Sequence, residues 1–98
     1  MLGVVGKKYD ALVRAGDGYN SVETDAAIAM THIILAAENE GVGTCWIANF
    51  DTVHLRSVLS LKENQVVYGI TPLGYPPQGF TKKGEKKRKL FGDVVKYR

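Results

Sequence analysis

Cysteine is scarce in this chain, since Cys45 is the only one among 98 residues. A single cysteine excludes an intramolecular disulfide and a metal site built from paired thiolates. The two histidines, His32 and His54, do not form an HExxH motif or another spacing typical of metal ligands. The sequence therefore predicts no metal site and fits a reducing compartment.

Long apolar runs are also missing. No segment reaches the roughly 18 apolar residues that suggest a membrane span. In the opening stretch MLGVVGKKYDAL, the lysines follow a short apolar run, whereas a signal peptide has them before a longer one. We therefore expect a cytoplasmic protein with no membrane partner.

The composition is that of a soluble globular protein, with 45% hydrophobic and 23% charged residues. A chain of 98 residues is long enough for one modest domain, residues 1–98. Its charge is unevenly distributed. Residues 1–81 carry a net charge of −3, whereas residues 82–98 carry +6. Any anionic partner should therefore bind the basic C-terminal tail, residues 78–98.

The basic run KKGEKKRKL in this tail allows three interpretations: a solvated charged segment, a nucleic-acid contact or a clamp for a phosphorylated cofactor. The aromatic residues Phe91 and Tyr97 follow the run and do not interleave with it, which counts against a nucleic-acid partner. The residues alone do not choose among the three interpretations.

The clearest predicted element is a helix over residues 24–40, ended by Gly41. It is apolar nearly all round, which is typical of a buried helix. The run TCWIA, residues 44–48, predicts a short buried strand. Asp51 is the expected N-cap of a second helix over residues 52–60, with Val53, Leu55, Val58 and Leu59 turned inward.

The ends of the chain are less regular. Residues 65–75 predict another strand, interrupted by Pro72, and Val94 and Val95 could pack on a sheet edge. Residues 1–20 predict a loop, although Leu2 to Val5 could end a strand. The pattern indicates an α+β fold in which helices pack on a small mixed or antiparallel sheet. Because so little sheet cannot cover so much apolar surface, we expect a partner chain or another half of the domain.

Individual residues favour structural roles. Cys45 lies among large apolar groups and follows a helix end, which indicates a packed, unreactive thiol. Trp46 is expected to be a core aromatic, and His32 a partly buried structural histidine. Gly41 and Gly43 precede a strand and follow a helix, the reverse of a dinucleotide fingerprint.

The run from Asp25 to Arg98 nevertheless resembles a known family. DAAIAMTHIILAAENEGVGTCWIANFD, then VVYGITPLGYPP, then KKRKLFGDVV resemble, in order and spacing, the C-terminal half of the nitroreductase family of flavin enzymes. The resemblance implies a partial nitroreductase-like α+β fold and FMN bound at a homodimer interface. It also implies transfer of electrons from NAD(P)H to a small acceptor such as a nitroaromatic or a quinone.

The family's site residues can be placed on this sequence. The resemblance implies that Trp46 and Ile47 pack near the flavin ring and that the N–H groups of Ala48 and Asn49 face its N5 and O4 atoms. Lys86 and Arg88 match positions that contact the FMN phosphate. No dedicated catalytic side chain is implied, because the cofactor carries the hydride.

Residues 1–24 do not match the Arg-rich segment with which family members begin. Two hypotheses follow. The chain could be a truncated half of an FMN-dependent NAD(P)H oxidoreductase, which works as a homodimer or with a complementary half. Alternatively, it could be a catalytically silent association module that lacks a complete flavin site.

Overall fold

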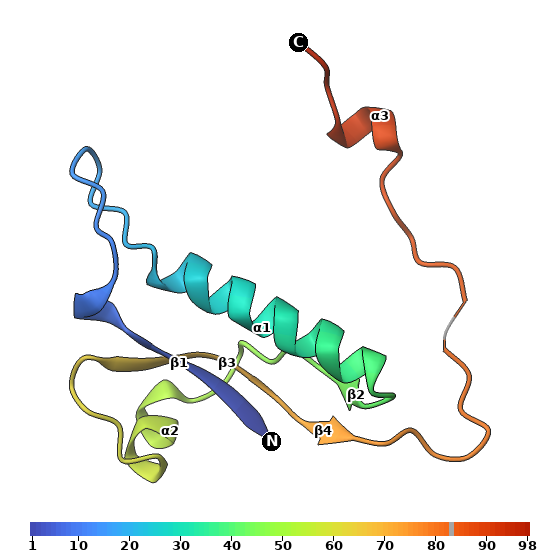
Figure 1. The fold of residues 1–98 in the computed structure, drawn as a ribbon, viewed down its shortest axis with the longest axis horizontal. Coiled ribbons are helices and arrows are strands. Elements are labelled where there is room, and N and C mark those ends of the chain that lie inside the picture. Colours follow the sequence, from blue (N-terminus) through green and yellow to red (C-terminus); the bar gives the residue numbers. More distant parts are fainter. Residues whose placement is uncertain (83) are drawn as a thin grey trace.

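The chain forms a small layered body with a long C-terminal extension (Figure 1). The computed structural model describes residues 1–82 and 84–98. Its radius of gyration is 17.3 Å, whereas a compact domain of this length has about 13 Å. The excess reflects the extension, because residues 84–98, here called the arm, run away from the body in Figure 1.

The main sheet pairs the two ends of the body. Strand β1, Leu2–Lys7, runs antiparallel to β3, Gln65–Thr71. The register shifts between Val4 and Val5, where a bulge interrupts the ladder. The loop expected over residues 1–20 is therefore wrong for residues 2–7, which form a strand. The alternative, that Leu2 to Val5 belong to a strand, is the correct one.

Two features hid β1 from local sequence rules. Its residues pair with partners that lie 58 to 69 positions away along the chain, and its glycines lower the strand propensity. One of them, Gly6, is required by packing. A Cβ there would lie 2.5 Å from Cγ2 of Val22 and 2.9 Å from Cε2 of Tyr68. A short 3-10 turn, Lys8–Asp10, follows β1.

Helix α1, Val22–Asn39, confirms the helix predicted over residues 24–40. It crosses the sheet and contacts both β1 and β3 (Figure 1). Val22, Ala26 and Met30 are buried on its inner face, at the spacing of four that places residues on one side of a helix. Ile28 and Leu35 are 52% and 62% exposed, so the expectation of burial on all sides is wrong within this chain.

The end of α1 follows from its sequence. Gly41 adopts a φ of 72°, the left-handed conformation that glycine takes without steric cost. Its N–H donates to the carbonyl of Glu38 at 3.1 Å, and the N–H of Val42 donates to that of Ala37 at 2.8 Å. This pair of bonds is a Schellman motif, so the expected cap at Gly41 is confirmed.

The second sheet is much smaller. Strand β2, Gly43–Thr44, pairs antiparallel with β4, Leu73–Gly74. Pro72 separates β3 from β4, because proline has no N–H to donate to a ladder. The buried strand predicted over residues 44–48 is wrong in both length and burial, because only Thr44 of that range belongs to β2 and Cys45, Trp46 and Ala48 are exposed.

Helix α2, Thr52–Val58, begins after Asp51 as predicted. One carboxylate oxygen of Asp51 accepts hydrogen bonds from the N–H groups of Val53 and His54, both at 2.9 Å. The predicted inward face is only partly correct. Leu55 is half-buried, but the side chains of Val53, Val58 and Leu59 are exposed.

Near its end the arm forms a short helix, α3, Phe91–Val94. Figure 1 shows α3 standing apart from both sheets, so the expected packing of Val94 and Val95 on a sheet edge does not occur. Throughout the ranges 1–82 and 84–98, no helix is long and apolar enough to cross a membrane.

Candidate functional site

The segment Trp46–Asn49 is held against the free edge of β3. Ile47 and Ile70 form an isolated antiparallel bridge with two backbone hydrogen bonds of 2.8 and 3.0 Å. The hydroxyl of Thr71, which is fully buried, accepts a bond from the N–H of Cys45 at 3.1 Å. The same hydroxyl donates to the carbonyl of Pro72 at 2.9 Å. The backbone on the N-terminal side of Ala48 is thereby fixed.

Beyond Ile47 the backbone leaves the sheet. Ala48 and Asn49 are exposed. In the described part of the chain, no hydrogen bond joins either of their N–H groups to an acceptor. The capped start of α2 at Asp51 then fixes the far end of this segment. Two consecutive donors are thus held between two anchored points and remain free for a ligand.

Trp46 lies between the sheet and α1. A Cβ added to Gly69 would be 2.7 Å from its Nε1 atom, so the indole rests directly on this glycine. On the other side it lines a shallow cavity with residues of α1, namely Thr24, Ala27, Ile28, Thr31 and His32. Trp46 is 42% exposed, and His32 is exposed. The expectations of a core tryptophan and a partly buried histidine are therefore wrong within this chain.

Lys86 and Arg88 lie on the exposed arm. The segment that joins β2 to α2 lies at the centre of the body. Figure 1 shows that the arm is directed away from it. The structure therefore brings Trp46, Ile47, Ala48 and Asn49 together, whereas Lys86 and Arg88 lie apart from them.

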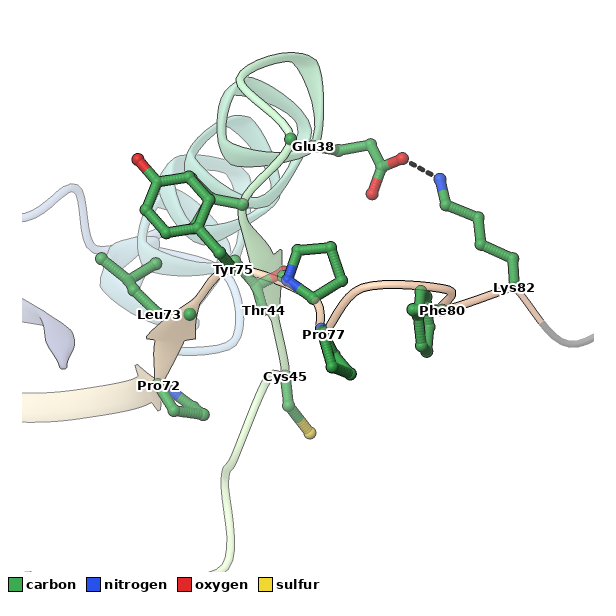
Figure 2. A pocket seen from close by; sticks show the side chains of 14 residues that line it. Glu38, Thr44, Cys45, Pro72, Leu73, Tyr75, Pro77, Phe80 and Lys82 are labelled. Carbon is green, nitrogen blue, oxygen red and sulfur yellow. Dashed lines mark hydrogen bonds and ion pairs between the residues drawn. The ribbon is translucent and has the colours of Figure 1, made fainter.

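A cavity of about 500 Å³ occupies the carboxyl end of α1, between the β2–β4 pair and the segment that follows β4. Cys45 lines this cavity and is exposed, so the packed thiol expected from the sequence is wrong. Glu38 and Lys82 form an ion pair at the rim (Figure 2). The sequence analysis did not predict this cavity, although residues 74–77, Gly-Tyr-Pro-Pro, which line it, indicate a corner in the chain.

The expected absence of a metal site remains a prediction. Among the residues that the structure describes, no three His, Cys, Asp or Glu side chains are grouped as metal ligands would be.

Comparison with known proteins defines the class of this fold. A nitroreductase family protein from Clostridium difficile matches 95% of this chain with a TM-score of 0.84 and 26% identity. One from Clostridium novyi matches 78% of the chain with a TM-score of 0.68 and 37% identity. The expected partial nitroreductase-like α+β fold is confirmed.

The sequence gives the same result. The model of the Nitroreductase family matches residues 5–75, which is well over half of the chain. A protein of Archaeoglobus fulgidus, named "Putative NADH dehydrogenase/NAD(P)H nitroreductase", is 34% identical over 62 residues. This chain belongs to the nitroreductase family, whose members generally use a flavin and NAD(P)H and are commonly dimeric.

The chain corresponds to only part of these relatives. It covers 36% of the Archaeoglobus fulgidus protein, 55% of the Clostridium difficile protein and 41% of the Clostridium novyi protein.

Proposed function

We propose that this chain contributes the FMN-contacting edge of an NAD(P)H oxidoreductase of nitroreductase type. The observation that carries the proposal is the pair of N–H groups at Ala48 and Asn49, which have no acceptor among the described residues. They follow Ile47, which both donates a backbone hydrogen bond to Ile70 of β3 and accepts one from it. Preorganised backbone donors stabilise negative charge without reorganisation at the moment of reaction. Such donors fit the electron-rich edge of a flavin ring.

Each proposed residue has a role that its position supports. When bound, FMN would supply hydride transfer between NAD(P)H and a small acceptor such as a nitroaromatic or a quinone. Ala48 and Asn49 would orient the ring through their N–H groups. Trp46 and Ile47 would pack near the ring and exclude water from it, since the indole of Trp46 rests on Gly69 and the backbone of Ile47 is bonded to β3 next to the free amides.

Lys86 and Arg88 would bind the FMN phosphate, for which guanidinium and ammonium groups are suited. Because the arm stands clear of its own body, we propose that this contact forms in the assembled protein, a homodimer or a complex with a complementary half. The exposed Ile28 and Leu35 support such an assembly, because another polypeptide would cover them.

A visible spectrum of the purified protein and a fluorescence titration with FMN test the cofactor. We expect the absorbance band of oxidised flavin, quenching of flavin fluorescence on binding, and bleaching of the band by NADH or NADPH. A colourless protein that quenches no flavin fluorescence, alone or with a complementary half, would contradict the proposal. It would favour the association module, for which the exposed apolar residues are the supporting observation.

The amide contacts have a matched pair of variants. Asn49→Pro removes the N–H, whereas Asn49→Ala keeps it and removes only the side chain. We expect Asn49→Ala to bind FMN as the parent does and Asn49→Pro to lose at least about tenfold in affinity, which is about 1.4 kcal/mol. Circular dichroism checks that both variants fold. If Asn49→Pro and Asn49→Ala bind FMN with equal affinity, the N–H of Asn49 does not contact the cofactor.

The phosphate contacts can be separated from general charge effects. The double variant Lys86→Ala with Arg88→Ala should weaken FMN binding but leave the binding of riboflavin, which lacks the phosphate, unchanged. Lys96→Ala with Arg98→Ala removes the same charge from the same arm and serves as the control. If both pairs weaken FMN equally, or if riboflavin is weakened as much as FMN, the phosphate role is wrong.

A further inference from the structure

The cavity at the carboxyl end of α1 is formed by three segments that are distant in sequence. The end of α1 provides one side, β2 and Cys45 a second, and residues 72–82 the third. Figure 2 shows Pro77 and Phe80 on the same side of β2 as the sulfur of Cys45. The ion pair between Lys82 and Glu38 joins the segment after β4 to the end of the helix.

The walls of this cavity are suited to a flat apolar ring. They include three proline rings, two aromatic side chains and two aliphatic ones, namely Pro72, Pro76, Pro77, Tyr75, Phe80, Val42 and Leu73. Aromatic rings attract other rings in offset or edge-to-face geometry, beyond the gain from burying apolar area. A Cβ added at Gly41 or Gly74 would meet no atom within 4 Å, so backbone at these two positions lies open to a ligand.

The charges at the cavity favour an uncharged occupant. Glu38 and Lys82 are its charged lining residues, and they neutralise each other across the rim. A charged ligand would have to compete with this pair or lose hydration without a partner. A neutral ring would leave the pair intact.

We propose that this cavity binds a flat, uncharged aromatic molecule. Its volume of about 500 Å³ lies within the range of about 300 to 1,000 Å³ that is typical of small-molecule sites. None of its lining residues belongs to the segment Trp46–Asn49, so the site is distinct from the proposed flavin contacts. The probe experiment below therefore needs no FMN.

Cys45 provides a reporter for this site, because it lines the cavity and is the only thiol in the chain. The experiment measures alkylation of the protein by iodoacetamide, followed by mass spectrometry, with and without N-phenyl-1-naphthylamine, an uncharged aromatic probe. At a free probe concentration about ten times its Kd, mass action slows alkylation about tenfold if the probe covers the thiol. Probe fluorescence gives the Kd independently.

Two variants locate the effect. Gly74→Leu places a side chain in the open space at the wall and should abolish protection, whereas Gly16→Leu, at a glycine that also has open space but lies far from the cavity, should preserve it. Phe80→Ala should weaken protection, and Phe91→Ala, an exposed aromatic of α3, should not. The two aromatic truncations keep the test decisive if Gly74→Leu fails to fold.

Three results would overturn the proposal. The first is a rise in probe fluorescence without protection of Cys45, which would place the probe elsewhere. The second is stronger protection by the anionic 1-anilinonaphthalene-8-sulfonate. The third is a thiol that is protected without any probe in a protein of twice the chain mass, since a second copy would then fill the cavity.

Discussion

Ile47 and Ile70 exchange two backbone hydrogen bonds, although neither β2 nor β4 extends to them. The N–H of Ile47 donates to the carbonyl of Ile70 at 2.8 Å, and the N–H of Ile70 donates back at 3.0 Å. Through this pair, β3 holds β1 on one edge and the proposed flavin segment on the other. The stability of that edge can be tested one contact at a time.

Replacing Thr71 by valine tests the contact next to this bridge. The change keeps the shape of the buried side chain but leaves the N–H of Cys45 without its acceptor. This hydrogen bond is part-buried and Cys45 is exposed, so its loss costs about 0.5 to 1.5 kcal/mol; we expect a loss of unfolding free energy of this size in urea denaturation. Thr31→Val, which removes an exposed hydroxyl bond within α1, is the control and should be nearly neutral. Equal losses would mean that the Thr71 hydroxyl has no special role.

Gly69→Ala tests how closely Trp46 packs on β3. The new Cβ would lie 2.7 Å from Nε1 of the indole and 3.2 Å from Cε of Met30, so Trp46 must move outward. Overpacking of this kind costs about 1 to 3 kcal/mol. We expect lower stability and a shift of fluorescence to longer wavelength, which is easily assigned because Trp46 is the only tryptophan.

Gly3→Ala is the matched control for this change. Its Cβ would contact Cγ2 of Ile70 at 3.4 Å, an ordinary van der Waals distance. It should therefore leave the fluorescence unchanged. A spectral shift in both variants would show a general loosening of the sheet.

Asp51→Ala tests the start of α2. Removing the side chain leaves the N–H groups of Val53 and His54 without their acceptor. Loss of an N-cap costs about 1 kcal/mol, and urea denaturation should show this loss. Asp51→Asn should recover most of it, because an amide oxygen also caps. Ser21, at the N-cap position of α1, makes no capping bond to the backbone, so Ser21→Ala should have a smaller effect than Asp51→Ala.

The loop between β1 and α1 contains an ion pair whose pH dependence can be predicted. Arg14 donates from Nε to Oδ1 of Asp17 at 2.9 Å and also packs over the ring of Tyr19. The hydrogen bond from Arg14, helped by one from the N–H of Tyr19, lowers the pKa of Asp17 below its ordinary value of 3.8. The stabilisation is therefore fully present above that value and is lost as the pH falls through the lowered pKa.

An NMR titration of the Asp17 side chain measures this shift. We expect a midpoint below 3.8 in the parent and a return toward 3.8 in Arg14→Met, which removes the donor and the charge. Lys7→Met, which removes an ammonium that lies 3.8 Å from Asp10, is the control and should leave the Asp17 midpoint unchanged. An unchanged Asp17 midpoint in the variant would exclude Arg14 as the cause.

Features set by nearby residues could be predicted from the sequence. The body of α1, its cap at Gly41 and the capping role of Asp51 each depend on contacts within a few residues. Local rules describe such contacts well, because the acceptor or the required φ belongs to the same short segment. The family could also be predicted, since its motifs keep their order along the chain.

Features set by distant residues could not be predicted in the same way. The pairing of β1 with β3 depends on residues 58 to 69 positions apart, and the exposure of Cys45 depends on how residues 72–82 pass the end of α1. The predicted burial of Trp46 is wrong because its exposure also depends on segments that are distant in the sequence. Its indole is covered by Gly69 on one side, but α1 closes only part of the other.

The β1–β3 ladder also affects how the protein assembles during synthesis. β3 begins 58 residues after β1 ends, and a ribosome adding about 5 to 20 residues per second needs roughly 3 to 12 s to reach it. Throughout that interval the backbone groups of β1 lack β3, their partner in the folded chain, and such an unpaired strand can pair with other chains. A chaperone that binds short extended segments would therefore protect Leu2–Lys7 until translation has passed Thr71.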